Sequence, residues 1–201
     1  LIMLKNIIFD MGNVLIHWRA DSIMNSMGIK DEEERRVLKR RVFYSLEWPL
    51  LDWGMIKEKE AEEIFFSRTP NEYHSHIHHS LYWFDMLSPM ENMASLLKEL
   101  KEKGYKLFVL SNTSTLMREH FSLIPGSEYF DGLVFSAEEK LVKPMPEIYS
   151  LLLSRYSLKA EESLFVDDLP INCSAAQVMG MKGFVFNEDV EELREFIKSL
   201  E

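Results

Sequence analysis

Short, fully apolar stretches recur along the chain, and each of them ends abruptly at polar residues. Five have the length and composition of buried β-strands: 6–9, 106–110, 132–135, 163–166 and 183–186. Apolar residues at helical spacing predict helices in five further segments: 91–103, 114–121, 146–156, 172–179 and 190–200. Apolar strands that alternate with helices predict an α/β fold with a doubly wound, mostly parallel sheet. In such sheets the binding crevice lies beyond the carboxyl ends of the strands.

The interval between the first two strands is much longer than one crossover connection requires. A crossover needs about a dozen residues or more, whereas this interval runs from 10 to 106. Its own pattern predicts three helices: 31–41, 57–66 and 70–81. We therefore expect two domains, which are an α/β catalytic core at 1–16 and 90–201 and an all-helical cap inserted at 17–89. A cap inserted after the first strand would cover the carboxyl end of the sheet.

Composition and charge narrow the class of protein. With 201 residues and 46% apolar content, the chain can bury a sizeable core. A formal net charge of −10 without a basic block argues against nucleic-acid or anionic-membrane partners. A locally positive site could still bind a small phosphorylated metabolite, and no protein partner is evident. No stretch is apolar enough to cross a bilayer, and the single cysteine, Cys173, fits a reducing compartment, so the cytoplasm is the expected location.

Four polar clusters are expected to meet at the carboxyl edge of the sheet: Asp10-Met11-Gly12-Asn13, Ser111-Asn112-Thr113, Lys143-Pro144 and Asp167-Asp168. Alone, each is an ordinary turn or helix-capping sequence. Together they offer a carboxylate nucleophile, a hydroxyl and main-chain amides for a phosphate oxygen, a positive counter-charge and a carboxylate pair suited to Mg²⁺. Clustered carboxylates would raise one another's pKa unless a cation and Lys143 compensated them.

These motifs, in this order, resemble those of the haloacid dehalogenase (HAD) superfamily, and the helical insertion is similar to that family's cap (subfamily I, C1 cap). The opening Asp-Met-Gly-Asn-Val-Leu with Asp-Asp at the fourth motif most resembles a bacterial subgroup that includes an α-D-glucose-1-phosphate phosphatase. The resemblance implies a Mg²⁺-dependent phosphatase that hydrolyses small phosphate monoesters, sugar phosphates among them, through an aspartyl-phosphate on Asp10.

The resemblance also implies a role for each motif residue. Asp10 is the expected nucleophile, with Lys143 and Ser111 as further catalytic residues. The expected Mg²⁺ ligands are Asp10, the backbone carbonyl of Gly12, Asp167 and Asp168, of which Asp168 is the more direct of the adjacent pair. The residues expected to contact the phosphoryl group or substrate are Ser111, Asn112, Lys143, Gly12 and Asn13.

One position departs from this pattern. Most phosphatases of the superfamily carry a second aspartate two residues after the nucleophile, as general acid and base, and this chain has Gly12 there. Three interpretations are open: a metal-independent 2-haloacid dehalogenase, a weakly active or inactive ligand- or partner-binding relative, and a phosphatase whose leaving group needs less help or whose proton comes from elsewhere. We favour the third, because acid–base catalysis contributes about 10² to 10⁴-fold and its absence only slows the chemistry. His17 is close in sequence and could supply a proton, although a hinge role at the cap junction is favoured.

Histidines cluster in one segment of the predicted cap: His74, His76, His78 and His79. A zinc site is one interpretation of this cluster. His74 and His78 share one helix face at i, i+4 spacing, whereas His76 points elsewhere. No nearby acid or cysteine lies at matching spacing, so a polar cap surface is the favoured interpretation.

Two tryptophans, Trp48 and Trp53, lie near Asp52 and Gly54, where caps of this kind carry a specificity loop. Packing between cap and core is favoured over stacking on a sugar. In the core, Asn172 is expected to hydrogen-bond the aspartates of the metal site.

Overall fold

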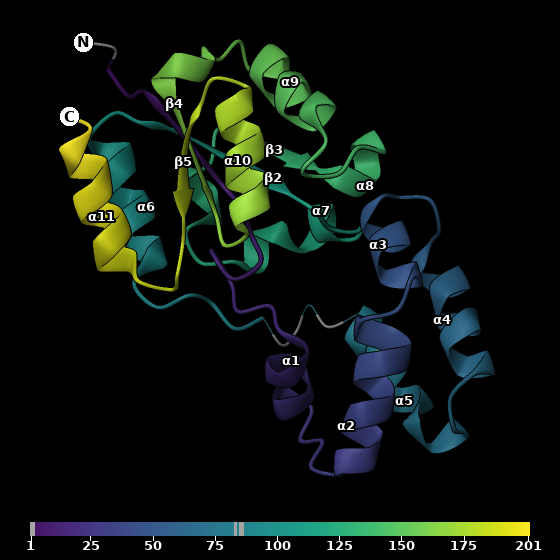
Figure 1. Ribbon diagram of the computed structural model, residues 1–201. Helices are drawn as coiled ribbons and strands as arrows, with labels where there is room; N and C mark the ends of the chain where they lie inside the picture. Colours follow the sequence, from purple (N-terminus) through teal and green to yellow (C-terminus); the bar gives the residue numbers. More distant parts are fainter. Residues whose placement is uncertain (1–2, 83, 85–86) are drawn as a thin grey trace.

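Five parallel strands form the centre of the computed structural model, which describes residues 3–82, 84 and 87–201 (Figure 1). The order across the sheet is β3-β2-β1-β4-β5. The strands are β1 Asn6–Phe9, β2 Lys106–Ser111, β3 Gly132–Phe135, β4 Ser163–Asp167 and β5 Lys182–Val185. β1 lies in the middle and pairs in parallel with β2 and β4. The predicted α/β fold with a doubly wound parallel sheet is confirmed.

Helices cover both faces of the sheet, so its central strands are buried along almost their whole length. The covering helices are α6 (Met93–Glu102) and α11 (Val190–Ser199) on one face, and α9 (Pro146–Arg155) and α10 (Pro170–Val178) on the other. Successive residues of β1 alternate between the two layers. Ile7 and Phe9 belong to the first apolar cluster and Ile8 to the second. The sheet therefore holds its strand ends rigidly.

Short elements connect the strands to the longer helices. They are α7 Met117–His120, α8 Ser136–Glu139 and the 3₁₀ turns Phe121–Leu123, Ser127–Tyr129 and Ala160–Glu162. α8 follows β3 directly and contacts the helical insertion at α3 (Glu47–Asp52), as Figure 1 also shows. The carboxyl edge of the sheet is thus the edge that the insertion approaches.

The helical insertion between β1 and β2 has an apolar cluster of its own. Its elements are α1 Ala20–Ser26, α2 Glu32–Leu38, a π-helical turn Lys39–Phe43, α3, α4 Glu58–Ser67, a 3₁₀ turn Asn71–Tyr73 and α5 His74–Leu81. Asp31 caps α2 by accepting a hydrogen bond from the Glu34 N–H at 2.8 Å. Buried residues of this cluster include Met24, Leu38 and Phe65. Among the described residues, no helix is both long and apolar enough to cross a membrane.

The two chain segments that join the insertion to the core run side by side. The His17 N–H donates to Ser88 O at 2.8 Å, and the Met90 N–H donates to Leu15 O at 2.9 Å. These bonds lie next to the boundaries expected from the sequence, and the domain limits at 17–89 stay a prediction.

The helices that the sequence pattern does not predict are the short ones. α1, α3 and α8 have seven, six and four residues, which is too few for a 3.6-residue period to show. The helix expected at 114–121 shrinks to α7, and β5 begins one residue earlier than expected. Boundaries of this kind depend on capping and tertiary contacts rather than on apolar periodicity.

Candidate active site

Three carboxylates converge at the carboxyl edge of the two central strands. Asp10 directly follows β1, while Asp167 ends β4 and is followed by Asp168. The Asp10 N–H donates to Val166 O at 2.8 Å, which continues the pairing of these strands. One carboxylate oxygen from each aspartate lies within 4.8 Å of the others. Carboxylate oxygens are the ligands that hard cations prefer, so this donor set fits Mg²⁺.

Lys143 places a positive charge between two of these carboxylates. Its Nζ lies 2.8 Å from Asp10 Oδ1 and 2.6 Å from Asp167 Oδ2, and the residue is 4% exposed. Asn112, just after β2, fixes the backbone of the lysine. The Asn112 Nδ2 donates to Lys143 O at 3.0 Å, and the Asn112 Oδ1 accepts from the Lys143 N–H at 2.8 Å. The second and third motifs are therefore one unit that positions the ammonium group.

The two adjacent aspartates differ in their surroundings. Asp167 is fully buried, and besides Lys143 it accepts hydrogen bonds from the Leu169 N–H at 2.8 Å and from Asn172 Nδ2 at 3.0 and 3.1 Å. The predicted hydrogen bond of Asn172 to this pair of aspartates is found with Asp167. Asp168 is half-buried and accepts one hydrogen bond from Asn13 Nδ2, at 3.0 Å, within the part of the chain that the structure describes. Asp168 therefore keeps more lone pairs for another ligand.

The loop after Asp10 explains why a glycine stands at position 12. A Cβ added to Gly12 would lie 2.9 Å from Trp18 Cδ1 and 3.3 Å from Trp18 Cβ, which is too close for a larger side chain without a shift of the indole. Asn13 adopts a left-handed backbone with φ of 54°, which asparagine tolerates better than most residues. Its Oδ1 accepts from the Trp18 N–H at 2.9 Å while its Nδ2 holds Asp168.

Burial and crowding of charge shift the pKa values of this cluster. Burial raises the pKa of Asp10 to about 6, with Lys143 opposing and Asp167 adding to the rise. Burial also raises the pKa of Asp168, although the hydrogen bond from Asn13 opposes the rise. Burial alone would lower the pKa of Lys143, but the charges of Asp10 and Asp167 outweigh it and raise the value. Lys143 does not fully offset the effect of burial on Asp10 and Asp168, so a bound cation would stabilise the charged forms of these two acids.

Ser111, the last residue of β2, is buried beside this cluster. Its hydroxyl makes no hydrogen bond within the described part of the chain, and so it is available to a substrate oxygen. The backbone after it is held in place, because the Thr113 N–H donates to Ser136 Oγ at 2.9 Å.

Two cavities adjoin the aspartates on the side of the cap. The first is small and is lined by Met11, Trp18, Trp48, Leu51, Asp52, Glu58, Leu81, Phe84, Thr113, Ser114 and Met117. The second is more open, and its lining includes Asn13, Arg19, Tyr44, Asp52 and Asp168. Asp52 lines both. The sequence pattern places Asp52 in the cap without indicating chemistry for it, and Gly54, two residues later, is the local signal of a close backbone approach there.

The cap tryptophans take part in packing and docking. The Trp48 ring lies 5.3 Å from Trp18 and 5.4 Å from Phe43 between centroids, and it packs against the apolar cluster of the cap. The Trp53 Nε1 donates to Lys140 O at 2.9 Å, across the contact between cap and core. The Trp53 contact agrees with the favoured interpretation of packing between cap and core, whereas the ring contacts of Trp48 lie within the cap.

The histidines do not form a common site. His76 Nδ1 lies 2.5 Å from Glu34 Oε1 and His78 Nδ1 lies 2.5 Å from Glu62 Oε1, so each pairs with a different helix. Within the described residues, only the three aspartates form a cluster that could hold a metal. His17 faces Glu188, with Nδ1 3.8 Å from Oε2, in a pocket that contains none of these aspartates.

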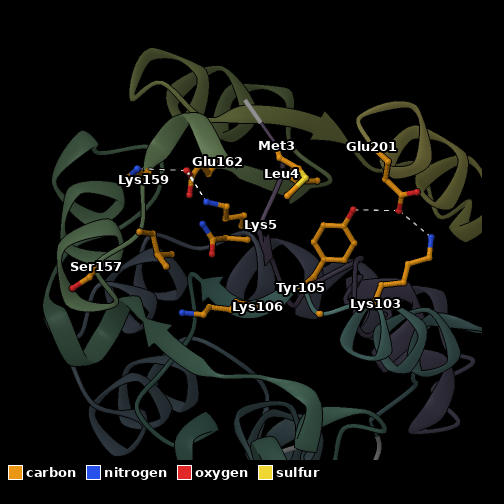
Figure 2. Close-up of a pocket in the computed structure, with 13 residues that line it drawn as sticks. Met3, Leu4, Lys5, Lys103, Tyr105, Lys106, Ser157, Lys159, Glu162 and Glu201 are labelled. Carbon is orange, nitrogen blue, oxygen red and sulfur yellow. Dashed lines mark hydrogen bonds and ion pairs between the residues drawn. The ribbon is translucent and has the colours of Figure 1, made fainter. Parts of the chain in front are cut away.

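A wide pocket at the opposite end of the sheet is a poor alternative site. It is lined by residues around the start of β1 and β2, among them Lys5, Lys106 and Tyr105, as Figure 2 shows. The Lys5 Nζ donates to Glu162 Oε1 at 3.0 Å, and other lysines of this pocket also pair with glutamates. It holds neither a nucleophile with a partner base nor one of the four motifs.

The family model described as haloacid dehalogenase-like hydrolase matches residues 4–180. The chain therefore belongs to this family of hydrolases. A sesquiterpene phosphatase of Aspergillus oryzae is 28% identical over 201 residues, with 96% of each chain covered. A D-ribitol-5-phosphate phosphatase of Bacteroides thetaiotaomicron is 24% identical, covering 90% of this chain and 91% of its own. A HAD family enzyme of the same bacterium, solved in complex with magnesium and inorganic phosphate, has a similar structure, with a TM-score of 0.73, 22% identity and coverage of 94% and 98% of the two chains.

Proposed function

We propose that this chain is a Mg²⁺-dependent phosphatase that hydrolyses small phosphate monoesters through an aspartyl-phosphate on Asp10. The observation that carries the proposal is the convergence of Asp10, Asp168 and Lys143 at one edge of the sheet. An anionic nucleophile can approach an anionic phosphoryl group only where positive charge offsets their repulsion. Membership of the family and the two phosphatases among its relatives support the same conclusion.

The proposed metal site consists of Asp10, the backbone carbonyl of Gly12, Asp167 and Asp168. Asp168 is the more direct ligand of the adjacent pair, because the oxygens of Asp167 already accept hydrogen bonds from nitrogen donors, Lys143 among them. Asp167 would then act chiefly by holding Lys143. When bound, Mg²⁺ would supply positive charge to the phosphoryl oxygens and to the carboxylates.

Each remaining motif residue has a role that follows from its position. The Asp10 carboxylate attacks phosphorus, and the ester oxygen departs with the leaving group. The Lys143 ammonium and the Ser111 hydroxyl hold oxygens of the transferring group, while Asn112 keeps Lys143 in place through its backbone. Asn13 holds Asp168. Water then attacks the aspartyl-phosphate and releases inorganic phosphate.

The proposed leaving-group site is the small cavity beside Asp10. Its lining is mainly apolar and aromatic, with Trp18, Trp48 and Phe84 among its residues. Such a lining favours an ester with an apolar face, as the name of the sesquiterpene phosphatase also suggests, while the other phosphatase acts on a phosphorylated sugar alcohol. The resemblance to the glucose-1-phosphate phosphatase subgroup and the cytoplasmic location stay predictions from the sequence.

Removal of divalent metal is expected to lower turnover of p-nitrophenyl phosphate by about 100-fold or more, because the charge that a metal supplies to the transition state is worth several kcal/mol. The test compares initial rates in Mg²⁺ and in EDTA, followed by re-addition of Mg²⁺, over a panel with benzyl, terpenyl and sugar phosphates. Turnover that is equal in EDTA and in Mg²⁺ contradicts the metal-dependent mechanism.

The rival interpretations predict different results from the same preparation. A dehalogenase would release chloride from 2-chloropropionate in the presence of EDTA. A ligand- or partner-binding relative would turn over no member of the panel. The proposed phosphatase should also melt at a higher temperature with Mg²⁺ and beryllium fluoride together, because a ligand that binds only the native state stabilises it.

A further inference from the structure

The missing acid at position 12 leaves the leaving group without an obvious proton donor on the core. The indole of Trp18 occupies the space that a side chain at Gly12 would need. His17 lies in a different pocket and faces Glu188. A donor must therefore come from another element that reaches the aspartates, and the cap helix α3 is such an element.

We propose that Asp52, the last residue of α3, is the general acid and base of this active site. The inference rests on the proposed phosphatase function. Three residues line both cavities, Trp18, Trp48 and Asp52, and Asp52 is the acid among them. The small cavity also contains Met11 and Thr113, and the open one contains Asn13 and Asp168. The Asp52 side chain thus reaches the space in which a leaving group bound beside Asp10 would lie.

The backbone around Asp52 is docked onto the core. Ser136 Oγ donates to Asp52 O, and the Trp53 Nε1 donates to Lys140 O at 2.9 Å. Gly54 has φ of +69°, and a Cβ there would lie 2.2 Å from Ala137 O, so only glycine allows this approach. Contacts on Asp52 itself and on the two residues after it hold the carboxyl group over the carboxyl edge of the sheet.

The surroundings of Asp52 suit proton transfer near neutral pH. Burial raises its pKa to about 7; the charge of Asp10 adds to the rise and that of Lys143 opposes it. A cation bound at Asp10 would remove the contribution of that charge but not the larger one of burial. The other charged groups that face these cavities are Glu58 from α4, Arg19 and Asp21 from the start of α1, and Asp168. A group with a pKa near the working pH can both give and accept a proton.

The proposed steps balance in atoms and charge. In the first, Asp10 Oδ forms a bond to phosphorus, the bond from phosphorus to the ester oxygen breaks, and protonated Asp52 gives its proton to that oxygen, so that a neutral alcohol leaves. In the second, the Asp52 carboxylate takes a proton from water, the water oxygen bonds to phosphorus, and the bond from Asp10 to phosphorus breaks. Inorganic phosphate leaves, and both side chains return to their initial states.

The test measures how the effect of Asp52→Asn on kcat/KM depends on the leaving group of the substrate. The substrates are p-nitrophenyl phosphate, whose phenolate leaves without a proton, and benzyl phosphate, whose alkoxide needs one. For benzyl phosphate we expect kcat/KM to fall about 10² to 10⁴-fold, and for p-nitrophenyl phosphate we expect kcat/KM to stay nearly unchanged. With p-nitrophenyl phosphate the variant should release a burst of nitrophenolate equal in amount to the enzyme. Turnover should then be slow, because the hydrolysis of the aspartyl-phosphate lacks its base.

Three further variants separate chemistry from structure. Asp52→Glu should recover part of the lost rate with benzyl phosphate. Glu58→Gln changes the other acid of the small cavity and should affect both substrates by the same factor. Glu63→Gln, an exposed acid on α4, should match the parent. Melting temperatures of all variants show whether each one folds.

Each failure has its own signature. Equal losses with both substrates in Asp52→Asn, or no loss at all, overturn the assignment of Asp52 while the phosphatase function stands. A dependence on the leaving group that appears in Glu58→Gln instead assigns the proton to Glu58 and also overturns it. A parent protein that turns over neither substrate overturns the proposed function and the Asp52 assignment with it.

Discussion

Asp10→Asn is expected to lower phosphatase turnover by about 10⁴-fold or more. The neutral amide oxygen is a poor nucleophile, so the covalent step that divides the hydrolysis into two easier ones is lost. The loss should be similar for p-nitrophenyl and benzyl phosphate, because both substrates need the same nucleophile. Initial rates with Mg²⁺, and the mass of the acid-quenched protein with and without a phosphoryl group, measure this effect.

The matched control for Asp10→Asn is Glu195→Gln, which neutralises an exposed acid on α11 far along the chain. It should turn over at the rate of the parent and form the same phosphorylated species. Equal turnover by Asp10→Asn and the parent would remove Asp10 from the chemistry. A phosphoryl group that is still trapped on Asp10→Asn would place the nucleophile elsewhere.

The convergence of the acids could be predicted from sequence because parallel strands end at one edge of a sheet. Asp10 and Asp167 are far apart in the chain, but each ends an apolar run, and β1 and β4 are adjacent. Lys143 lies in the segment between α8 and α9, and Asn112, just after β2, holds its backbone so that its ammonium group reaches both acids. Apolar runs and strand-end chemistry are local signals, so one sequence is enough to recognise them.

The interactions that orient the site could not be predicted in this way. Asn13 bonds Asp168 from a left-handed turn, and the Trp18 ring closes the space over Gly12. Both depend on how one loop folds back on itself, which periodicity does not encode. The position of Asp52 depends in addition on docking of the cap through Ser136, between elements that meet only in the folded chain.

The roles of the cap histidines depend on partners that lie on other helices. His76 and His78 match a metal-binding composition, yet each pairs with its own glutamate, Glu34 and Glu62, on two different helices. A composition signal states which chemistry is available, whereas burial and pairing decide how it is used. The same reasoning makes the buried pairs of Lys143 more informative than the many exposed ion pairs of this chain.

Lys143→Met is expected to remove most turnover and to lower the free energy of unfolding of the metal-free protein by about 3 to 5 kcal/mol. Removing one partner of a buried ion pair leaves the other charge without compensation, and here Asp10 and Asp167 would both lose their cation. Lys159→Met is the control, because it breaks an exposed pair with Glu162, and pairs of that kind contribute about 0 to 1 kcal/mol. Urea unfolding in EDTA measures both.

The loss of free energy of unfolding in Lys143→Met, relative to the parent, should grow as the pH rises. The pKa of Asp10 is already raised by burial to about 6, and Lys143 opposes that rise, so without the lysine the value must be higher still. The native state then holds a proton that the unfolded state releases above about pH 4, and stability falls as the pH rises from there through the native pKa. The parent loses less stability over the same pH range, because Lys143 keeps the native pKa of its Asp10 lower. Unfolding curves at pH 5 and pH 8 should therefore show the larger difference between variant and parent at pH 8. If the difference in unfolding free energy between variant and parent is equal at pH 5 and pH 8, or larger at pH 5, Lys143 does not compensate the charge of Asp10.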